Sequence, residues 1–199
     1  MDSFLKNYKL ILASQSPRRH ELMKVLGWEF EIKMANVEEN FPPNYTKEDI
    51  PLYLARLKAD ALVDQLKENE ILITADTIVW FKNRALNKPL NDEDAVQMLT
   101  ALSGNTHQVY TAVQLTHVAK RFSFYAETNV TFDRLKQEEI RHYVDAYKPL
   151  DKAGAYGIQE WIGYIGIESI EGSFYNVMGL PIQMLYKELQ SFVKMLPPR

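Results

Sequence analysis

Two arginines stand at the start of the first predicted helix, where charge of their sign is unfavourable. Residues 10–13 are apolar and Ser-Gln-Ser-Pro follows, which predicts a short buried strand, a turn, and a helix with Ser16 as N-cap and Pro17 as first residue. A helix N-terminus carries partial positive charge, so Arg18 and Arg19 cost about 0.3–1 kcal/mol each there. A bound anion would reverse the sign. The alternative is two solvated surface arginines, but the whole pattern favours a phosphate site.

One carboxylate lies within the most apolar stretch of the chain. Residues 71–81 predict a buried strand, and Asp76 is the acidic residue inside it. A buried carboxylate is costly unless it is paired, hydrogen-bonded or bound to a metal. Asp76 is therefore either a core residue held by Thr74, Thr77 or a lysine, or a functional group. The functional interpretation is a general base or a metal ligand at the wall of a cleft.

Lys88 bears on this choice because of a predicted hairpin. Residues 82–84 form a turn signal after the apolar strand. If the turn centres on Asn83, Lys88 lies across from Ile78. Its long side chain would then reach the diagonal neighbour, Asp76. The two would form either a plain salt bridge or a base beside a phosphate-binding cation.

A loop at 150–159 contains residue types that bind nucleotides. Gly154 and Gly157 allow a ligand to approach the backbone closely. Lys152 can bind phosphate, and Gln159 can pair with a base edge through its amide donor and acceptor. The loop lacks the spacing and ending of a Walker loop. An ordinary flexible turn is the alternative.

Other polar residues are less informative by themselves. Glu38 and Glu39 precede a proline loop and have the pattern of solvated side chains. Lys58 lies among alanines and leucines, where a lysine usually extends its ammonium group outward. The four histidines lack metal-ligand spacing, and we interpret them as incidental. No Gly-x-Ser-x-Gly or Gly-x-Gly-x-x-Gly motif is present in the sequence.

The composition narrows the class of protein. A chain of 199 residues with 46% hydrophobic residues is expected to form a single domain, residues 1–199, of two lobes. Its net charge of −3 argues against a nucleic-acid binder, so any polyanion site must be local. The absence of cysteine excludes disulfides, thiolate metal sites and a cysteine nucleophile. No apolar run approaches the ~18 residues of a membrane span, and we expect a cytoplasmic protein.

Helices alternate with strands that are both adjacent and distant in the sequence. This order predicts an α/β fold with a mixed sheet flanked by helices. The expected helices cover residues 17–26, 47–67 with an interruption near Pro51, 91–104, 137–147 and 181–196. The expected strands cover residues 10–13, 30–34, 71–81, 85–87, 109–118, 122–132 and 161–170.

A series of short segments resembles the Maf family of nucleoside triphosphate pyrophosphatases. The segments occur in family order over nearly the whole length, which makes the resemblance very specific. They are Ser-Gln-Ser-Pro-Arg-Arg at 14–19, Leu-Ala-Arg-Leu-Lys-Ala at 54–59, Ala-Asp-Thr-Ile-Val at 75–79, Asn-Lys-Pro at 87–89, Leu-Ser-Gly-Asn-Thr-His-Gln-Val-Tyr-Thr at 102–111, Pro-Leu-Asp-Lys-Ala-Gly-Ala-Tyr-Gly-Ile-Gln at 149–159, and Asn-Val-Met-Gly-Leu-Pro at 176–181.

The resemblance implies a fold and a reaction. The fold is elongated and two-lobed with a deep central cleft, similar to inosine triphosphate pyrophosphatase, and is often a homodimer. The reaction is hydrolysis of a nucleoside triphosphate to the monophosphate and pyrophosphate, with Mg²⁺ or Mn²⁺. The form of the 152–159 segment resembles the branch that acts on dTTP and UTP, whereas the branch that acts on 7-methyl-GTP typically has Phe-Lys-Ser-Glu there.

The resemblance also assigns roles to residues. Asp76 takes the place of the proton acceptor and, with Glu39, of a metal ligand. Positions that matter for substrate choice are Arg18, Thr77 and Gln159. Positions that line the phosphate and metal cleft are Ser14, Arg19, Glu39, Lys58 and Lys88. Lys152 is a further phosphate ligand on the ground of its residue type and its loop rather than of the resemblance.

Two departures from the family pattern concern the pocket. Gln15 stands where a small residue is common, and Glu160-Trp161 follows the glutamine where Gly-Leu-Gly is frequent. Two alternatives to a dTTP and UTP pyrophosphatase therefore stay open. One is the same chemistry on another nucleotide, such as 7-methyl-GTP or a modified pyrimidine nucleotide. The other is a non-catalytic nucleotide-binding regulator of septum formation.

Overall fold

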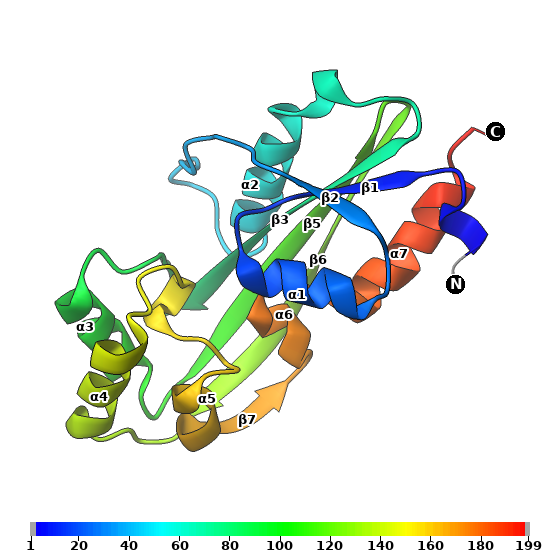
Figure 1. Ribbon diagram of the computed structural model, residues 1–199. Helices are drawn as coiled ribbons and strands as arrows, with labels where there is room; N and C mark the ends of the chain where they lie inside the picture. The colour runs from blue at the N-terminus through cyan, green and yellow to red at the C-terminus, as the bar shows by residue number, and fades with distance from the viewer. Residues whose placement is uncertain (1–2, 198–199) are drawn as a thin grey trace.

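The computed structural model describes residues 3–197, and its centre is a seven-stranded sheet (Figure 1). The strand order is β2-β1-β3-β5-β6-β7, and β4 pairs with β3. β1 is parallel to β2 and β3, whereas the other pairs are antiparallel, so the predicted mixed sheet is confirmed. The strands are β1 Lys9–Ala13, β2 Phe30–Lys33, β3 Glu70–Phe81, β4 Arg84–Leu86, β5 Thr106–His117, β6 Lys120–Phe132 and β7 Ile167–Glu171.

Helices cover both faces of this sheet and gather at one end of it (Figure 1). The α-helices are α1 Pro17–Val25, α2 Asp49–Asp60, α3 Asp92–Leu102, α4 Gln137–Tyr147, α5 Trp161–Gly166, α6 Phe174–Met178 and α7 Ile182–Lys194. Short 3-10 turns are η1 Ser3–Leu5, η2 Val63–Gln65 and η3 Ala153–Ala155. The predicted α/β class is confirmed.

The apolar run in β1 serves both faces of the sheet. Successive side chains of a strand point to opposite sides. Leu10 and Leu12 pack in a cluster with residues of α1 and α7, whereas Ile11 and Ala13 pack on the other side with Ala59 of α2. A strand buried on both faces reads as a continuous apolar run rather than an alternating one. This is why residues 10–13 carry four apolar side chains in a row.

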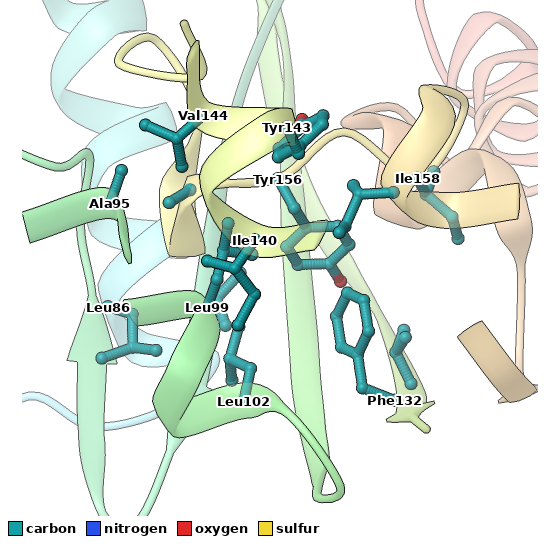
Figure 2. Packing of buried hydrophobic residues seen from close by; sticks show 14 of the residues in the cluster. Leu86, Ala95, Leu99, Leu102, Phe132, Ile140, Tyr143, Val144, Tyr156 and Ile158 are labelled. Atoms are coloured by element: carbon teal, nitrogen blue, oxygen red, sulfur yellow. The ribbon is translucent and has the colours of Figure 1, made fainter. Parts of the chain in front are cut away.

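A separate apolar cluster forms the lobe at the other end of the sheet (Figure 2). Leu99 of α3 and Ile140 and Tyr143 of α4 pack there against Phe132 of β6 and Tyr156 of the 150–159 loop. All five side chains are at most 5% exposed. The loop is therefore part of a packed lobe, which excludes the flexible-turn alternative for its Tyr156 end.

Gly154 brings this loop directly against the central strand. Its φ is +68°, and a Cβ at this position would lie 2.9 Å from Cγ2 of Val79 in β3. Both the left-handed backbone and the close approach require glycine here. The loop and β3 are thus in direct contact.

The predicted strand at 161–170 is wrong in its first half. Residues Trp161–Gly166 form α5, and the strand is restricted to Ile167–Glu171. A Cβ at Gly163 would lie 1.9 Å from the carbonyl oxygen of Ile158, so the glycine lets this helix pack on the loop before it. Tertiary packing overrides the low helix propensity of glycine and β-branched residues. The short helix α6 has no counterpart among the predicted elements.

Two further expectations need correction. The helix predicted at 47–67 ends at Asp60, and Pro51 does not interrupt it because it lies in the first turn, where no N–H partner is lost. The hairpin pairs Val79 with Leu86, so its register is one residue away from the predicted one. β4 ends at Leu86, and the predicted pairing of Lys88 with Ile78 is wrong.

Between residues 3 and 197, no helix is long and apolar enough to cross a membrane.

Candidate active site

A cleft of about 770 Å³ lies between the two lobes, against the middle of β3. Loops after β1 and β2, α1, α2, β3 and the 150–159 loop contribute to its wall. The ten residues to which the sequence or the resemblance gave a role in the site line this cleft: Ser14, Arg18, Arg19, Glu39, Lys58, Asp76, Thr77, Lys88, Lys152 and Gln159. The structure therefore brings together residues spread over 146 positions of the chain, from 14 to 159. Gly154, expected to admit a ligand, does not line it and packs against Val79 instead.

The start of α1 has the predicted cap. Ser16 Oγ accepts from the backbone N–H of Arg19 at 3.5 Å, and Pro17 is the first helical residue. Arg19 turns inward, where its Nε donates to the carbonyl of Gly179 at 2.7 Å and its Nη2 to Thr77 Oγ1 at 2.9 Å. Burial lowers the pKa of Arg19, against the opposing effect of Asp76. A guanidinium fixed at a helix N-terminus is suited to bind phosphate.

Hydrogen bonds behind Arg19 hold its partners in place. Thr77 Oγ1 is 2.9 Å from Thr111 Oγ1, and Thr111 donates to the carbonyl of Asn176 at 2.9 Å. The amide of Asn176 in turn donates to the carbonyl of Val109 and to Thr128. The C-terminal segment that presents Gly179 to Arg19 is therefore anchored to the sheet.

Lys58 joins two of the cleft's carboxylates, those of Glu39 and Asp76. Its Nζ lies 2.6 Å from Asp76 Oδ1 and 2.7 Å from Glu39 Oε1. The side chains of Lys58 and Asp76 are 11% and 9% exposed, whereas that of Glu39 is 43% exposed. Lys58 does not extend outward, as lysines on apolar faces usually do, because Asp76 offers it a buried partner.

Lys88 faces Glu39 rather than Asp76. Its Nζ lies 3.7 Å from Glu39 Oε2, and its side chain is 59% exposed. The predicted convergence of Lys88 on Asp76 is wrong because the hairpin register differs by one residue and Lys58 takes that place. Lys88 still lines the cleft.

The two carboxylates differ in acidity. Burial raises the pKa of Asp76 above its ordinary value, although Lys58 and Arg19 pull the other way. Burial also acts on Glu39, but Lys58, Lys88 and Arg19 together lower its pKa below the ordinary value. A raised pKa makes Asp76 the better proton acceptor of the two.

Glu39 and Asp76 could bind a divalent cation only if substrate phosphates supplied further ligands. Glu39 and Asp76 supply carboxylate oxygens from one wall of the cleft. In residues 3–197, no group of three or more His, Cys, Asp or Glu side chains could hold a metal by itself. Mg²⁺ is typically bound by one or two carboxylates, with substrate phosphates and waters as its other ligands.

A second buried lysine lies at the other side of the cleft. Lys152 Nζ is 2.7 Å from Asp151 Oδ1 and 3.2 Å from Glu160 Oε1. The other oxygen of Asp151 pairs with Arg18 Nη1 at 3.0 Å. This pair connects α1 in one lobe with the 150–159 loop in the other.

Gln159 offers an unused acceptor to the cleft. Its Oε1 is buried and has no hydrogen-bond partner among the described residues, and the residue lines the cleft. A buried amide oxygen without a partner is costly, and a ligand with an N–H group would satisfy it.

Sequence reasoning missed the residues that support this site. Gly179 accepts from Arg19, Thr111 and Asn176 support Thr77 behind it, and Tyr143 donates to Glu160. Thr111, Asn176 and Gly179 carried a signal only as members of segments that resemble the family, and Glu160 carried one as a departure from the family pattern. Tyr143 carried none, because a tyrosine on the apolar face of a helix has the pattern of a core residue.

Comparison with known proteins agrees with this geometry. A solved structure of a HAM1 protein from Coxiella burnetii has the same fold, with a TM-score of 0.50 at 15% identity, covering 92% of this chain and 99% of the other. The family model described as Maf-like protein matches residues 9–192. The chain thus has the fold of the HAM1 proteins, and it belongs to the Maf family.

Curated relatives match almost the whole chain. A protein named dTTP/UTP pyrophosphatase from Bacteroides thetaiotaomicron is 54% identical over 187 residues, which are 94% of this chain and 97% of that protein. One of the same name from Porphyromonas gingivalis W83 is 50% identical over 191 residues, with 94% and 96% coverage.

Proposed function

We propose that this protein hydrolyses dTTP and UTP to the monophosphate and pyrophosphate. One observation carries the proposal: a buried carboxylate of raised pKa, Asp76, lies beside Lys58 in a cleft that four further cationic side chains line. The curated relatives at 50–54% identity carry the name of this activity. The arrangement suits attack by water on a polyphosphate, which needs charge neutralisation and a proton acceptor rather than a covalent nucleophile.

In this proposal, different residues of the cleft have different roles in the reaction. Asp76 accepts the proton from the attacking water as its oxygen bonds to the α phosphorus. The bond from the α phosphorus to the bridging oxygen breaks, and pyrophosphate leaves with the bond's electron pair. Arg19 and Lys58 offset the charge that develops on the phosphates.

Other residues of the cleft complete this assignment. Arg18, Lys88 and Lys152 are further cationic groups for the triphosphate, and Ser14 supports Arg19 through its Oγ at 3.5 Å. Glu39, with Asp76, would hold Mg²⁺ or Mn²⁺, which supplies additional neutralisation of phosphate oxygens when bound.

Gln159 supports the choice of a pyrimidine. Uracil and thymine present an N3–H donor between two carbonyl acceptors. The unpartnered Oε1 of Gln159 can accept from N3–H, while its amide nitrogen donates to a carbonyl. Adenine presents its donor on the exocyclic amine and its acceptor on the ring, in the reverse order, so an amide held in one orientation leaves both groups mismatched and the site rejects adenine. Thr77 accepts a hydrogen bond from Arg19 close by. We include Thr77 among the residues that determine substrate choice.

The test is the product pattern. Wild-type protein is incubated with dTTP and Mg²⁺ or Mn²⁺, without added pyrophosphatase, and monophosphate, pyrophosphate and orthophosphate are measured separately. We expect dTMP and pyrophosphate; dTDP and orthophosphate would overturn the proposal. Comparable kcat/KM for 7-methyl-GTP would favour that nucleotide instead, and binding without turnover would favour a non-catalytic regulator.

A single domain, a homodimer and a cytoplasmic location belong to the same proposal. They are supported by chain length, by the resemblance and by composition. One cooperative unfolding transition and the mass from light scattering test the first two.

A further inference from the structure

The hydroxyl group of Tyr143 forms hydrogen bonds with both ends of the turn at 157–160, which carries Gln159. Tyr143 Oη accepts from the backbone N–H of Gly157 at 3.0 Å and donates to the carboxylate of Glu160. Within the turn, the Glu160 N–H donates to the Gly157 carbonyl at 3.0 Å. The first and last residues are therefore fixed to the same atom of α4, and Gln159 lies between them.

The side chain of Glu160 folds back over Gly157. A Cβ at Gly157 would lie 2.7 Å from Cδ of Glu160, so this conformation of the turn depends on glycine. Tyr143 is completely buried in the apolar cluster of the second lobe (Figure 2). Burial raises the pKa of Tyr143, and Glu160 raises it further, so the hydroxyl keeps its proton as donor. A buried phenol in a packed core is a rigid anchor.

Glu160 also connects the turn to the cleft. Its second oxygen lies 3.2 Å from Lys152 Nζ, Lys152 holds Asp151, and Asp151 holds Arg18. The hydrogen bonds and ion pairs thus run from α4 to α1 across the cleft. Displacing Glu160 would disturb both the turn with Gln159 and the pair with Arg18.

We infer that Tyr143 and Glu160 are positioning residues for base selectivity, because they fix the turn so that the Gln159 amide faces the nucleobase. The inference rests on the proposed function. Neither residue touches the phosphates in this scheme, since the carboxylate of Glu160 is occupied by Tyr143 and Lys152. Their loss should therefore change the choice of base more than turnover.

Tyr143→Phe is the first test, with Tyr147→Phe as its matched control. Both residues lie on α4 and their rings stack at 5.0 Å, but Tyr147 is 41% exposed. We expect Tyr143→Phe to reduce the ratio of kcat/KM for dTTP to that for dATP by about three- to tenfold, typical of a lost hydrogen bond. The loss should appear in KM for dTTP, with kcat nearly unchanged. Equal ratios in the two variants would overturn the inference.

Amide exchange of Gly157 is a readout that needs no substrate. Its N–H donates to Tyr143, so Tyr143→Phe should accelerate its exchange, whereas Tyr147→Phe should not. Unchanged exchange in Tyr143→Phe would overturn the positioning role. Failure of the proposed function looks different: wild-type protein then releases no pyrophosphate from dTTP, and the exchange of Gly157 alone decides whether Tyr143 holds the turn.

Glu160 variants separate position from charge. Glu160→Gln keeps an acceptor for Tyr143 but loses the charge beside Lys152, whereas Glu160→Ala loses both. We expect Glu160→Gln to retain most of the selectivity and Glu160→Ala to lose as much as Tyr143→Phe. If Glu160→Gln is as unselective as Glu160→Ala, selectivity depends on the negative charge of Glu160 beside Lys152 and not on its contact with Tyr143. The inference then fails.

Discussion

The cleft contains two buried lysines, each held between two carboxylates. The aspartate of one cluster has a raised pKa, and the aspartate of the other has a lowered pKa. Lys58 lies between Glu39 and Asp76, and Lys152 lies between Asp151 and Glu160. Burial raises the pKa of Asp76 in the first cluster. In the second, burial also acts on Asp151, but Lys152 and Arg18 together lower its pKa below the ordinary value.

Exposure explains the opposite outcomes. The side chain of Asp76 is 9% exposed and loses most of its hydration, whereas that of Asp151 is 57% exposed and loses only part of it. Desolvation outweighs a neighbouring cation only where water is excluded. The same arrangement of charges therefore produces a carboxylate of raised pKa at one place and one of lowered pKa at the other.

The first prediction tests this difference at the two aspartates. Asp76→Asn should lower turnover with dTTP by about 10²–10⁴, the usual share of a general base, while nucleotide binding persists. Asp151→Asn should lower it less than tenfold, because this carboxylate holds Arg18 and Lys152 rather than a reacting proton. Pyrophosphate release under saturating dTTP measures both. Near-normal turnover in Asp76→Asn would remove Asp76 from the mechanism.

The second prediction compares the lysines by stability. Lys58→Met leaves Asp76 buried without its cation and should lower the free energy of unfolding by about 3 kcal/mol. Lys152→Met should cost about 1 kcal/mol, because Asp151 keeps Arg18 and Glu160 keeps Tyr143. Urea denaturation at neutral pH measures the two values. Equal losses would show that the two clusters are energetically alike.

The third prediction compares the arginines at the start of α1. Arg19→Ala should weaken binding of a non-hydrolysable triphosphate by about 1.5–3 kcal/mol, as expected for a lost charged hydrogen bond. Arg18→Ala should weaken it less and alter base preference, because the resemblance places Arg18 among the positions that matter for substrate choice and its side chain lines the cleft. Calorimetric titration provides both numbers. A bound nucleotide with its phosphates far from residues 14–19 would contradict the assignment.

The fourth prediction concerns pH. The proposed mechanism requires ionised Asp76, so kcat/KM should fall as the pH drops through the raised pKa of this group. Lys58 opposes the rise, so Lys58→Met should move the acid limb to higher pH. Lys152→Met should leave the limb in place, since Lys152 is not among the groups that shift Asp76. A limb that moves equally in both variants would show that it does not report Asp76.

Local signals made much of the fold predictable. The cap at Ser16, helix α4 and the long strand β3 each follow from a pattern within a few neighbouring residues. α5 was not predictable in the same way. The sequence predicted a strand there, whereas Gly163 permits helix contact with a loop whose position depends on the packing of the whole lobe.

The site was predictable as a set of residues but not as a set of contacts. The ten candidates share one cleft, yet the partner of Asp76 is Lys58, which is 18 residues away, and not Lys88. The hairpin register contributed to this difference, because Lys82 and Asn83 form a two-residue turn with positive φ at both positions, which shifts the pairing by one residue from a turn centred on Asn83. Tyr143 escaped notice because a tyrosine on the apolar face of a helix has the pattern of a core residue.

The pair between Arg18 and Asp151 has a consequence for the energetics of substrate entry. Its side chains are 22% and 57% exposed, so the pair contributes less than about 1 kcal/mol, and physiological salt weakens it further. A triphosphate that binds Arg18 must break the pair with Asp151, and this costs little of its binding free energy. The bridge holds the guanidinium near its working position in the free protein, yet ligand binding proceeds almost as if the bridge were absent.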